Sequence, residues 1–125
     1  MSTWAELKPL VMPAGWHFED DCASGQGSSY RHTDGRVLLV SVRVEMDDRA
    51  WLHASVSLHN RLPTWRELRE VKDWIVGPKR PAYQIFPRAE DYVNIHPYVL
   101  HLWAPLEGDD PIPRFNRDPE RMGGI

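Results

Sequence analysis

Two histidines and two tryptophans, at alternate positions in separate segments, are the residues whose types could do chemistry. His53 follows Trp51 in the segment AWLHASVSLH, and His101 precedes Trp103 in the segment YVLHLW. Imidazole titrates near neutral pH, so a histidine pair could supply a general base and a general acid. Tryptophan is instead typical of the anchors of protein interfaces. The same residues therefore fit either an enzyme or a binding surface.

Alternating apolar and polar residues predict the strands that carry these side chains. The runs 36–46 and 50–59 both place aliphatic residues on one face and polar or aromatic residues on the other. The acidic turn between them is short, so we expect an antiparallel pair. Trp51 and His53 then belong to the polar-aromatic face, and Arg43 lies on that face of the preceding strand.

The segment YVLHLW also alternates, and its leucines leave His101 and Trp103 on the polar-aromatic face. If this segment is an antiparallel neighbour of residues 50–59, Trp51 lies near Trp103 and His53 lies near His101. The predicted binding site is this face of the sheet. The sequence leaves open an alternative, in which other parts of the chain cover the tryptophans and the histidines make ordinary hydrogen bonds.

One main helix is predicted from Thr64 to Val76, in the segment LPTWRELREVKDWIVGP. Thr64 and Glu67 have the spacing of a capping box, and the Gly-Pro pair that follows ends the helix. The apolar residues recur on one stripe. Lys72 falls inside that stripe, where we expect it to extend to the rim of the sheet. Trp74 falls on the charged face, where it is a candidate anchor for a partner.

The order of these elements predicts an α+β fold, an antiparallel sheet of about five strands with one main helix packed on one face. Asp34 and Gly35 are a hairpin turn pair, and AYQIFP is a further expected strand. Residues 1–103 would form a single domain that begins with an irregular N-terminal arm. Residues 104–125, rich in proline and charge, would form an extended or disordered tail.

Composition narrows the class of protein. A chain of 125 residues fits one domain, and its net charge of −3 argues against direct nucleic-acid binding. Cys22 is the only cysteine, so no intrachain disulfide can form. No apolar run approaches the ~20 residues of a membrane helix. These features favour a protein of the cytoplasm.

Neither a metal nor a cofactor is expected. His53, His96 and His101 lack the close spacing of zinc ligands, and no cysteine pair accompanies them. The segment NIHP around His96 is more typical of a turn before the last strand. The glycine-rich loops that cradle phosphates are missing as well.

An enzymatic alternative rests on the segment HASV. It begins at His53 and has the H-x-[ST]-apolar form of two-histidine phosphoesterases, but the segments HPYV and HLWA lack the Ser or Thr of a second copy. In this alternative His53 and His101 act as acid and base on a phosphate ester or nucleotide. Arg43 or Lys72 would hold the anion.

The block WLHASVS…LPTWRELREVKDWIVGP…AYQIFP…YVNIHPYVLHLW resembles a family of small uncharacterised proteins encoded by bacteriophages and prophages, a domain of unknown function. The resemblance covers about Arg49 to Trp103. It implies an accessory gene product that acts in the cytoplasm of a bacterial host. It implies no catalytic residues.

Three functions follow from these observations. The first is binding to a host or phage protein, including inhibition of a host defence system in the manner of anti-CRISPR proteins. The second is the histidine phosphoesterase, and the third is a structural or self-assembling homodimer. For the binding function, the predicted site residues are Arg43, Trp51, His53, Trp74, His101 and Trp103.

Overall fold

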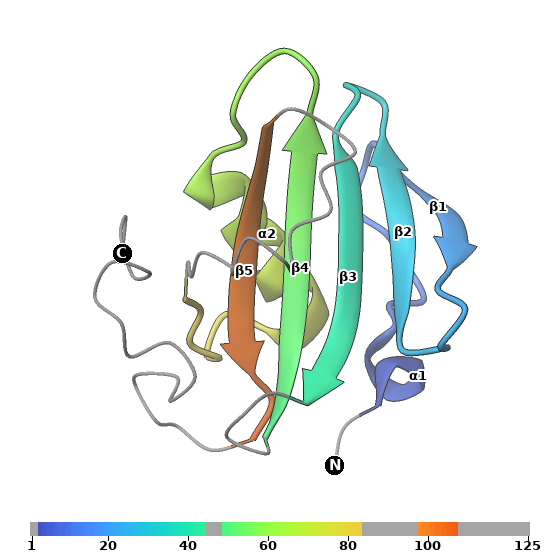
Figure 1. The fold of residues 1–125 in the computed structure, drawn as a ribbon, viewed down its shortest axis with the longest axis vertical. Helices are drawn as coiled ribbons and strands as arrows, with labels where there is room; N and C mark the ends of the chain where they lie inside the picture. Colours follow the sequence, from blue (N-terminus) through green and yellow to red (C-terminus); the bar gives the residue numbers. More distant parts are fainter. Residues whose placement is uncertain (1–2, 45–48, 84–97, 108–125) are drawn as a thin grey trace.

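The computed structural model describes residues 3–44, 49–83 and 98–107. Over these residues it contains one sheet of five strands, all antiparallel to their neighbours, in the order β1-β2-β3-β4-β5 (Figure 1). The strands are β1 (Trp16–Asp21), β2 (Gly27–His32), β3 (Val37–Val44), β4 (Ala50–Leu58) and β5 (Tyr98–Pro105). The helices are α1 (Trp4–Leu7) and α2 (Trp65–Val76). The predicted α+β class, with one main helix on a five-stranded antiparallel sheet, is confirmed.

The hairpin between β2 and β3 turns at the predicted Asp-Gly pair. Gly35 adopts φ of +100°, a conformation that glycine reaches without strain. The Asp34 carboxylate accepts a hydrogen bond of 3.0 Å from the backbone N–H of Arg36. This turn fixes the register in which Leu38 lies opposite Tyr30.

Helix α2 begins and ends where its sequence predicts. The Thr64 hydroxyl accepts from the N–H of Glu67 at 3.2 Å, and the Glu67 carboxylate accepts from the N–H of Thr64 at 2.9 Å. These two bonds satisfy N–H groups that have no partner within the helix. Gly77, at φ of +93°, follows the last turn.

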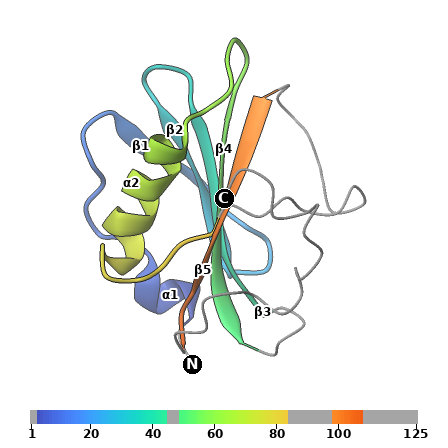
Figure 2. The same ribbon diagram turned by 90° about the vertical axis from the view of Figure 1, so that its left-hand side faces the viewer.

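The hydrophobic core lies between α2 and one face of the sheet, which we call the inner face. Figure 2 shows α2 on one side of the strands, and α2 contacts β4 and β5. Leu68 and Val71 of the helix pack with aliphatic residues that alternate along the strands. The strand members of this core include Leu38, Val40, Leu52, Ala54, Val56, Leu100 and Leu102. The predicted aliphatic face is therefore the inner face.

The N-terminal arm is more ordered than predicted. Helix α1 and strand β1 both lie in the segment that we expected to be irregular. The buried Trp4 indole donates to the Ser28 hydroxyl at 2.7 Å, and this hydroxyl donates to the Asp21 carboxylate at 2.6 Å. Pro9 and Pro13 prevent a long helix here, but α1 is a single turn that ends before Pro9 and buries Trp4.

The C-terminal strand extends further than predicted. Ala104 and Pro105 belong to β5 and are buried, although we placed them in the tail. Of the segment AYQIFP, Tyr83 forms an isolated bridge with Trp103. Residues 84–87 of that predicted strand, the turn at His96 and the tail from residue 108 lie outside the described residues. Within the described ranges, no helix is long and apolar enough to cross a membrane.

Candidate functional site

The two histidines of interest meet on the outer face of the sheet, which is the face opposite α2. Nε2 of His53 lies 2.9 Å from Nδ1 of His101. Their rings are nearly parallel, with centroids 5.1 Å apart and an interplanar angle of 8°. Trp103 stacks on His53 with a centroid distance of 4.3 Å. The predicted meeting of His53 and His101 is therefore present.

The register of β4 and β5 is shifted by two residues from the one we predicted. His53 lies opposite Trp103, and His101 lies opposite Ser55. His53 therefore reaches His101 along a diagonal of the sheet. Diagonal neighbours on one face remain within reach of aromatic side chains. This diagonal contact joins three rings in one group, in which His53 stacks on Trp103 and meets His101 through their ring nitrogens, where the predicted register gave two separate pairs.

Trp51 and Trp103 are not surface residues. Trp51 is 0% exposed and Trp103 is 4% exposed, and with Tyr83 they form a small second cluster. Tyr83 and Trp103 exchange backbone hydrogen bonds of 2.7 and 2.9 Å, which hold the chain after α2 against the edge of β5. The sequence left open whether these tryptophans are exposed or covered, and they are covered.

Arg43 is the exposed member of this group of residues. Its guanidinium lies 5.5 Å from the centre of the Trp103 ring, within the range of a cation–π contact. The positive charge of the guanidinium makes this side of the ring group electropositive. Arg43 therefore shapes the electrostatics of the histidine pair.

Both histidines are held in the neutral form at neutral pH. Burial first, and then the positive charge of Arg43, lower the pKa of His101 to about 4. The pKa of His53 is also well below its usual value, because of burial first and then the charges of His101 and Arg43. A short contact between two neutral rings is a hydrogen bond in which one ring donates and the other accepts.

A metal site at the histidine pair would need further ligands beside the two imidazoles. In the described part of the chain, no group of three or more His, Cys, Asp or Glu side chains is placed to hold an ion. His96, the third histidine considered above, lies outside the described residues.

Trp74 lies on the other side of the sheet, far from these residues in the fold. We predicted it on the charged face of α2, but its ring packs edge-on against Tyr30 with centroids 5.7 Å apart. Its indole N–H donates to the backbone carbonyl of Val11 at 3.1 Å. On this side α2 contacts β2 and the N-terminal arm, in addition to its contacts with β4 and β5. The apolar stripe of α2 is therefore wider than the sequence indicated.

The arm presents a surface that our sequence reasoning missed. Leu10 is 98% exposed and Val11 is 80% exposed, whereas Leu7 and Met12 on either side pack against the core. The apolar run LVM between two prolines was the available signal. We call Leu10, Val11 and Trp74 the arm–helix surface.

Lys72 is buried, contrary to the prediction that it reaches the rim of the sheet. Its side chain turns toward the C-terminal end of α2, where Nζ donates to the carbonyls of Gly77 at 3.1 Å and Arg80 at 2.9 Å. It also forms an ion pair with Asp73. These partners satisfy the ammonium locally, so it needs no path to solvent.

Comparison with known proteins gives a family and no named relative. No curated protein and no solved structure matches this chain at a significant level. A family whose description is a domain of unknown function, DUF7694, matches residues 43–107, more than half of the chain. The match includes the histidine pair, α2 and β5, and excludes the arm. This protein therefore belongs to the DUF7694 family.

Proposed function

We propose that this protein acts by binding another protein through the arm–helix surface. The observation that carries the proposal is the exposure of Leu10 and Val11, at 98% and 80%, on a segment that is fixed on both sides. Isolated exposed apolar residues are ordinary on protein surfaces, but two adjacent ones on a fixed segment beside a tryptophan form an anchor.

The contacts of the arm support this proposal because they hold the anchor in place before a partner arrives. On one side, the Lys8 ammonium donates to the Asp21 carboxylate at 2.9 Å. On the other side, Met12 packs against the core and the Val11 carbonyl accepts from Trp74. A segment that is already ordered loses little conformational entropy on binding.

The chemistry around the anchor defines the partner. A hollow of about 60 Å³ is lined by Pro13, Trp16, Arg36, Glu67, Glu70, Val71 and Trp74. Arg36 pairs with Glu67 at 3.3 Å, so the second carboxylate, Glu70, gives the hollow a net negative charge. An apolar side chain fits such a hollow, and a basic neighbour complements the carboxylate at its edge. The partner would therefore carry an apolar patch with basic residues beside it.

A basic partner agrees with the net charge of −3 and with the resemblance to phage and prophage proteins. Host proteins that handle nucleic acids carry basic surfaces, and a small acidic protein can occupy such a surface. We place the protein in the bacterial cytoplasm as a phage or prophage accessory protein. Inhibition of a host defence system, in the manner of anti-CRISPR proteins, is the specific form of this function.

The histidine pair gives the phosphoesterase alternative less support. A general acid must carry a proton at the working pH, and the lowered pKa values leave both rings neutral at pH 7. Acid and base must also stand on two sides of the phosphate. The 2.9 Å contact between the rings leaves no space for that group.

The test compares three tagged forms of the protein expressed in bacterial cells. They are the wild type, the arm variant Leu10→Ser/Val11→Ser, and a control variant Leu62→Ser, which alters another apolar residue with 56% exposure. Proteins recovered with the wild type are identified by mass spectrometry, and each is purified and its affinity for all three forms is measured.

We expect the arm variant to bind the purified partner at least tenfold more weakly, a loss of ~1.4 kcal/mol or more. The control variant should bind as the wild type does, and all three should melt at the same temperature. Unchanged affinity of the arm variant would contradict the proposal. A wild type that sediments as a dimer and an arm variant that sediments as a monomer would favour the homodimer instead.

A further inference from the structure

We propose that residues 77–83, which run from α2 to the edge of β5, form a strap that closes the outer-face cluster of Trp51 and Trp103. One end of the strap is held by the Lys72 ammonium. The other end is held by Tyr83, through its pairing with Trp103. We call these the Lys72 end and the Tyr83 end. The strap opens as a single unit, in which release of one end releases the other.

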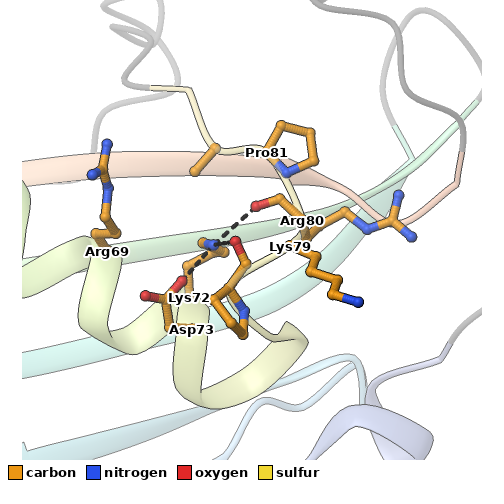
Figure 3. A pocket seen from close by; sticks show the side chains of 8 residues that line it. Arg69, Lys72, Asp73, Lys79, Arg80 and Pro81 are labelled. Atoms are coloured by element: carbon orange, nitrogen blue, oxygen red, sulfur yellow. Dashed lines mark hydrogen bonds and ion pairs between the residues drawn. The ribbon is translucent and has the colours of Figure 1, made fainter.

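The Lys72 end is organised by a buried charge. Lysine is rarely buried unless partners surround its ammonium, yet Lys72 is only 4% exposed. Its Nζ donates to three carbonyls of the strap, those of Gly77, Pro78 and Arg80, at 3.1, 3.4 and 2.9 Å. The same ammonium pairs with Asp73, and Figure 3 shows it between Asp73 and the loop that carries Arg80. Without this ammonium, the three carbonyls would lose a charged donor.

The Tyr83 end attaches the strap to the sheet. The N–H of Tyr83 donates to the carbonyl of Trp103 at 2.7 Å, and the N–H of Trp103 donates to the carbonyl of Tyr83 at 2.9 Å. The Tyr83 ring meets the Trp51 ring edge-on, with centroids 6.4 Å apart. Figure 2 shows the chain passing from the end of α2 to β5. Tyr83 therefore helps to cover the two tryptophans, and its position depends on the strap.

The strap is short and stiff, which makes its two ends depend on each other. Its sequence is GPKRPAY, and each of the two prolines fixes one backbone angle. The N–H of Arg80 donates to the carbonyl of Gly77 at 3.4 Å, so the segment also contains a turn. A segment of this kind has few ways to move one end while the other stays in place. Contiguous segments commonly open as cooperative units below the free energy of global unfolding.

Opening of the strap would change the outer face and leave the sheet intact. It would withdraw the Tyr83 backbone from Trp103 and the Tyr83 ring from Trp51. The pairing of β4 with β5 does not involve the strap and extends from Leu58 to Trp51 along β4. The strap therefore controls how much aromatic surface the outer face presents. This inference does not rest on the arm–helix surface or on its partner.

Amide hydrogen exchange followed by NMR measures local opening in the folded protein. The test variant is Lys72→Met, which keeps an apolar stem and removes the ammonium. The matched control is Lys79→Met, the same substitution at an exposed strap residue whose side chain points away from Lys72 in Figure 3. We expect Lys72→Met to speed exchange at the N–H groups of Tyr83 and Trp103 at least tenfold. Exchange in the control should stay within about twofold of the wild type, and the amides of β3 should be unchanged in both.

The reciprocal variant is Tyr83→Ala, which also decides the question if Lys72→Met does not fold. Coupling between two ends acts in both directions, so this variant should speed exchange of the Arg80 N–H at the Lys72 end. Lys72→Met with faster exchange at Arg80 alone would overturn the proposal, and so would an unchanged Arg80 in Tyr83→Ala. Equally faster exchange throughout β2 and β3 would show that Lys72 supports the whole fold and would also overturn it. The arm–helix surface is unaltered in each variant, so the outcome is independent of partner binding.

Discussion

The two faces of the sheet are both buried around β4, but they are buried by different chemistry. Leu52 on the inner face and Trp51 on the outer face are each 0% exposed. The inner face carries aliphatic side chains that pack under α2. These side chains have no polar atoms, so they need only complementary shapes. The outer face uses Trp103, His53 and His101, whose ring nitrogens must also find partners. The polar face of a strand is therefore not always exposed to solvent.

The largest expected effect compares a tryptophan of the outer face with a leucine of the inner face. Trp51→Ala should lower the free energy of unfolding by about 3–5 kcal/mol, because it empties a site lined by Tyr83 and the Arg49 guanidinium. Leu68→Ala under the helix should cost about 2–5 kcal/mol. Urea denaturation measures both. A loss below ~1 kcal/mol for Trp51→Ala would mean that the outer face adds little to stability.

Most of the inner face could be predicted from the sequence because its signals are local. The alternation of leucine and valine, the capping box at Thr64 and the Asp-Gly turn each involve residues a few positions apart. Each signal needs no knowledge of what lies across the sheet. The same reasoning missed α1 and β1, whose order depends on the bond from Trp4 to Ser28, 24 positions away.

For the outer face, the sequence predicted which residues lie there but not how they pair across the strands. Alternation placed His53, His101 and Trp103 on one face, but the register between β4 and β5 depends on pairing that no local pattern specifies. Trp74 and Lys72 were misplaced for a related reason. A helical wheel gives directions around the axis, and only the fold decides that the arm and the loop after α2 lie in those directions.

Acid should weaken the outer face before it affects the rest of the protein. An unfolded histidine gains a proton near pH 6.5, whereas His101 in the fold resists it until about pH 4. The unfolded state therefore binds more protons in this window, and stability falls as the pH is lowered through it. Each unit of difference is worth about 1.4 kcal/mol, so we expect a loss of roughly 1–2 kcal/mol between pH 7 and pH 5.

Urea denaturation at several pH values tests this expectation, with His101→Gln as the variant. Between pH 6.5 and pH 4 the variant should lose only the part of the slope that comes from His101, because His53, whose pKa is also well below its usual value, still contributes there. It should keep the separate loss at lower pH that comes from Glu67, whose pKa is lowered to about 2 mainly by its hydrogen bonds with Arg61. Glu67 stabilises the fold above pH 4.5, and that contribution declines as the pH falls toward 2. A wild type with constant stability between pH 7 and pH 5 would contradict the assignment.

The smallest expected effect concerns Arg43, the exposed edge of the outer face. Arg43→Gln removes a cation–π contact with Trp103 and should cost only about 0.5–1 kcal/mol. Its electrostatic effect is more specific. The charge of Arg43 helps to hold down the pKa of His101, so its removal should move that pKa from about 4 toward the ordinary value of 6.5. NMR titration of the His101 ring measures the shift directly. Because burial is the larger cause, the pKa should stay below 6.5 in the variant, and a full return to 6.5 would mean that charge, not burial, keeps this face neutral.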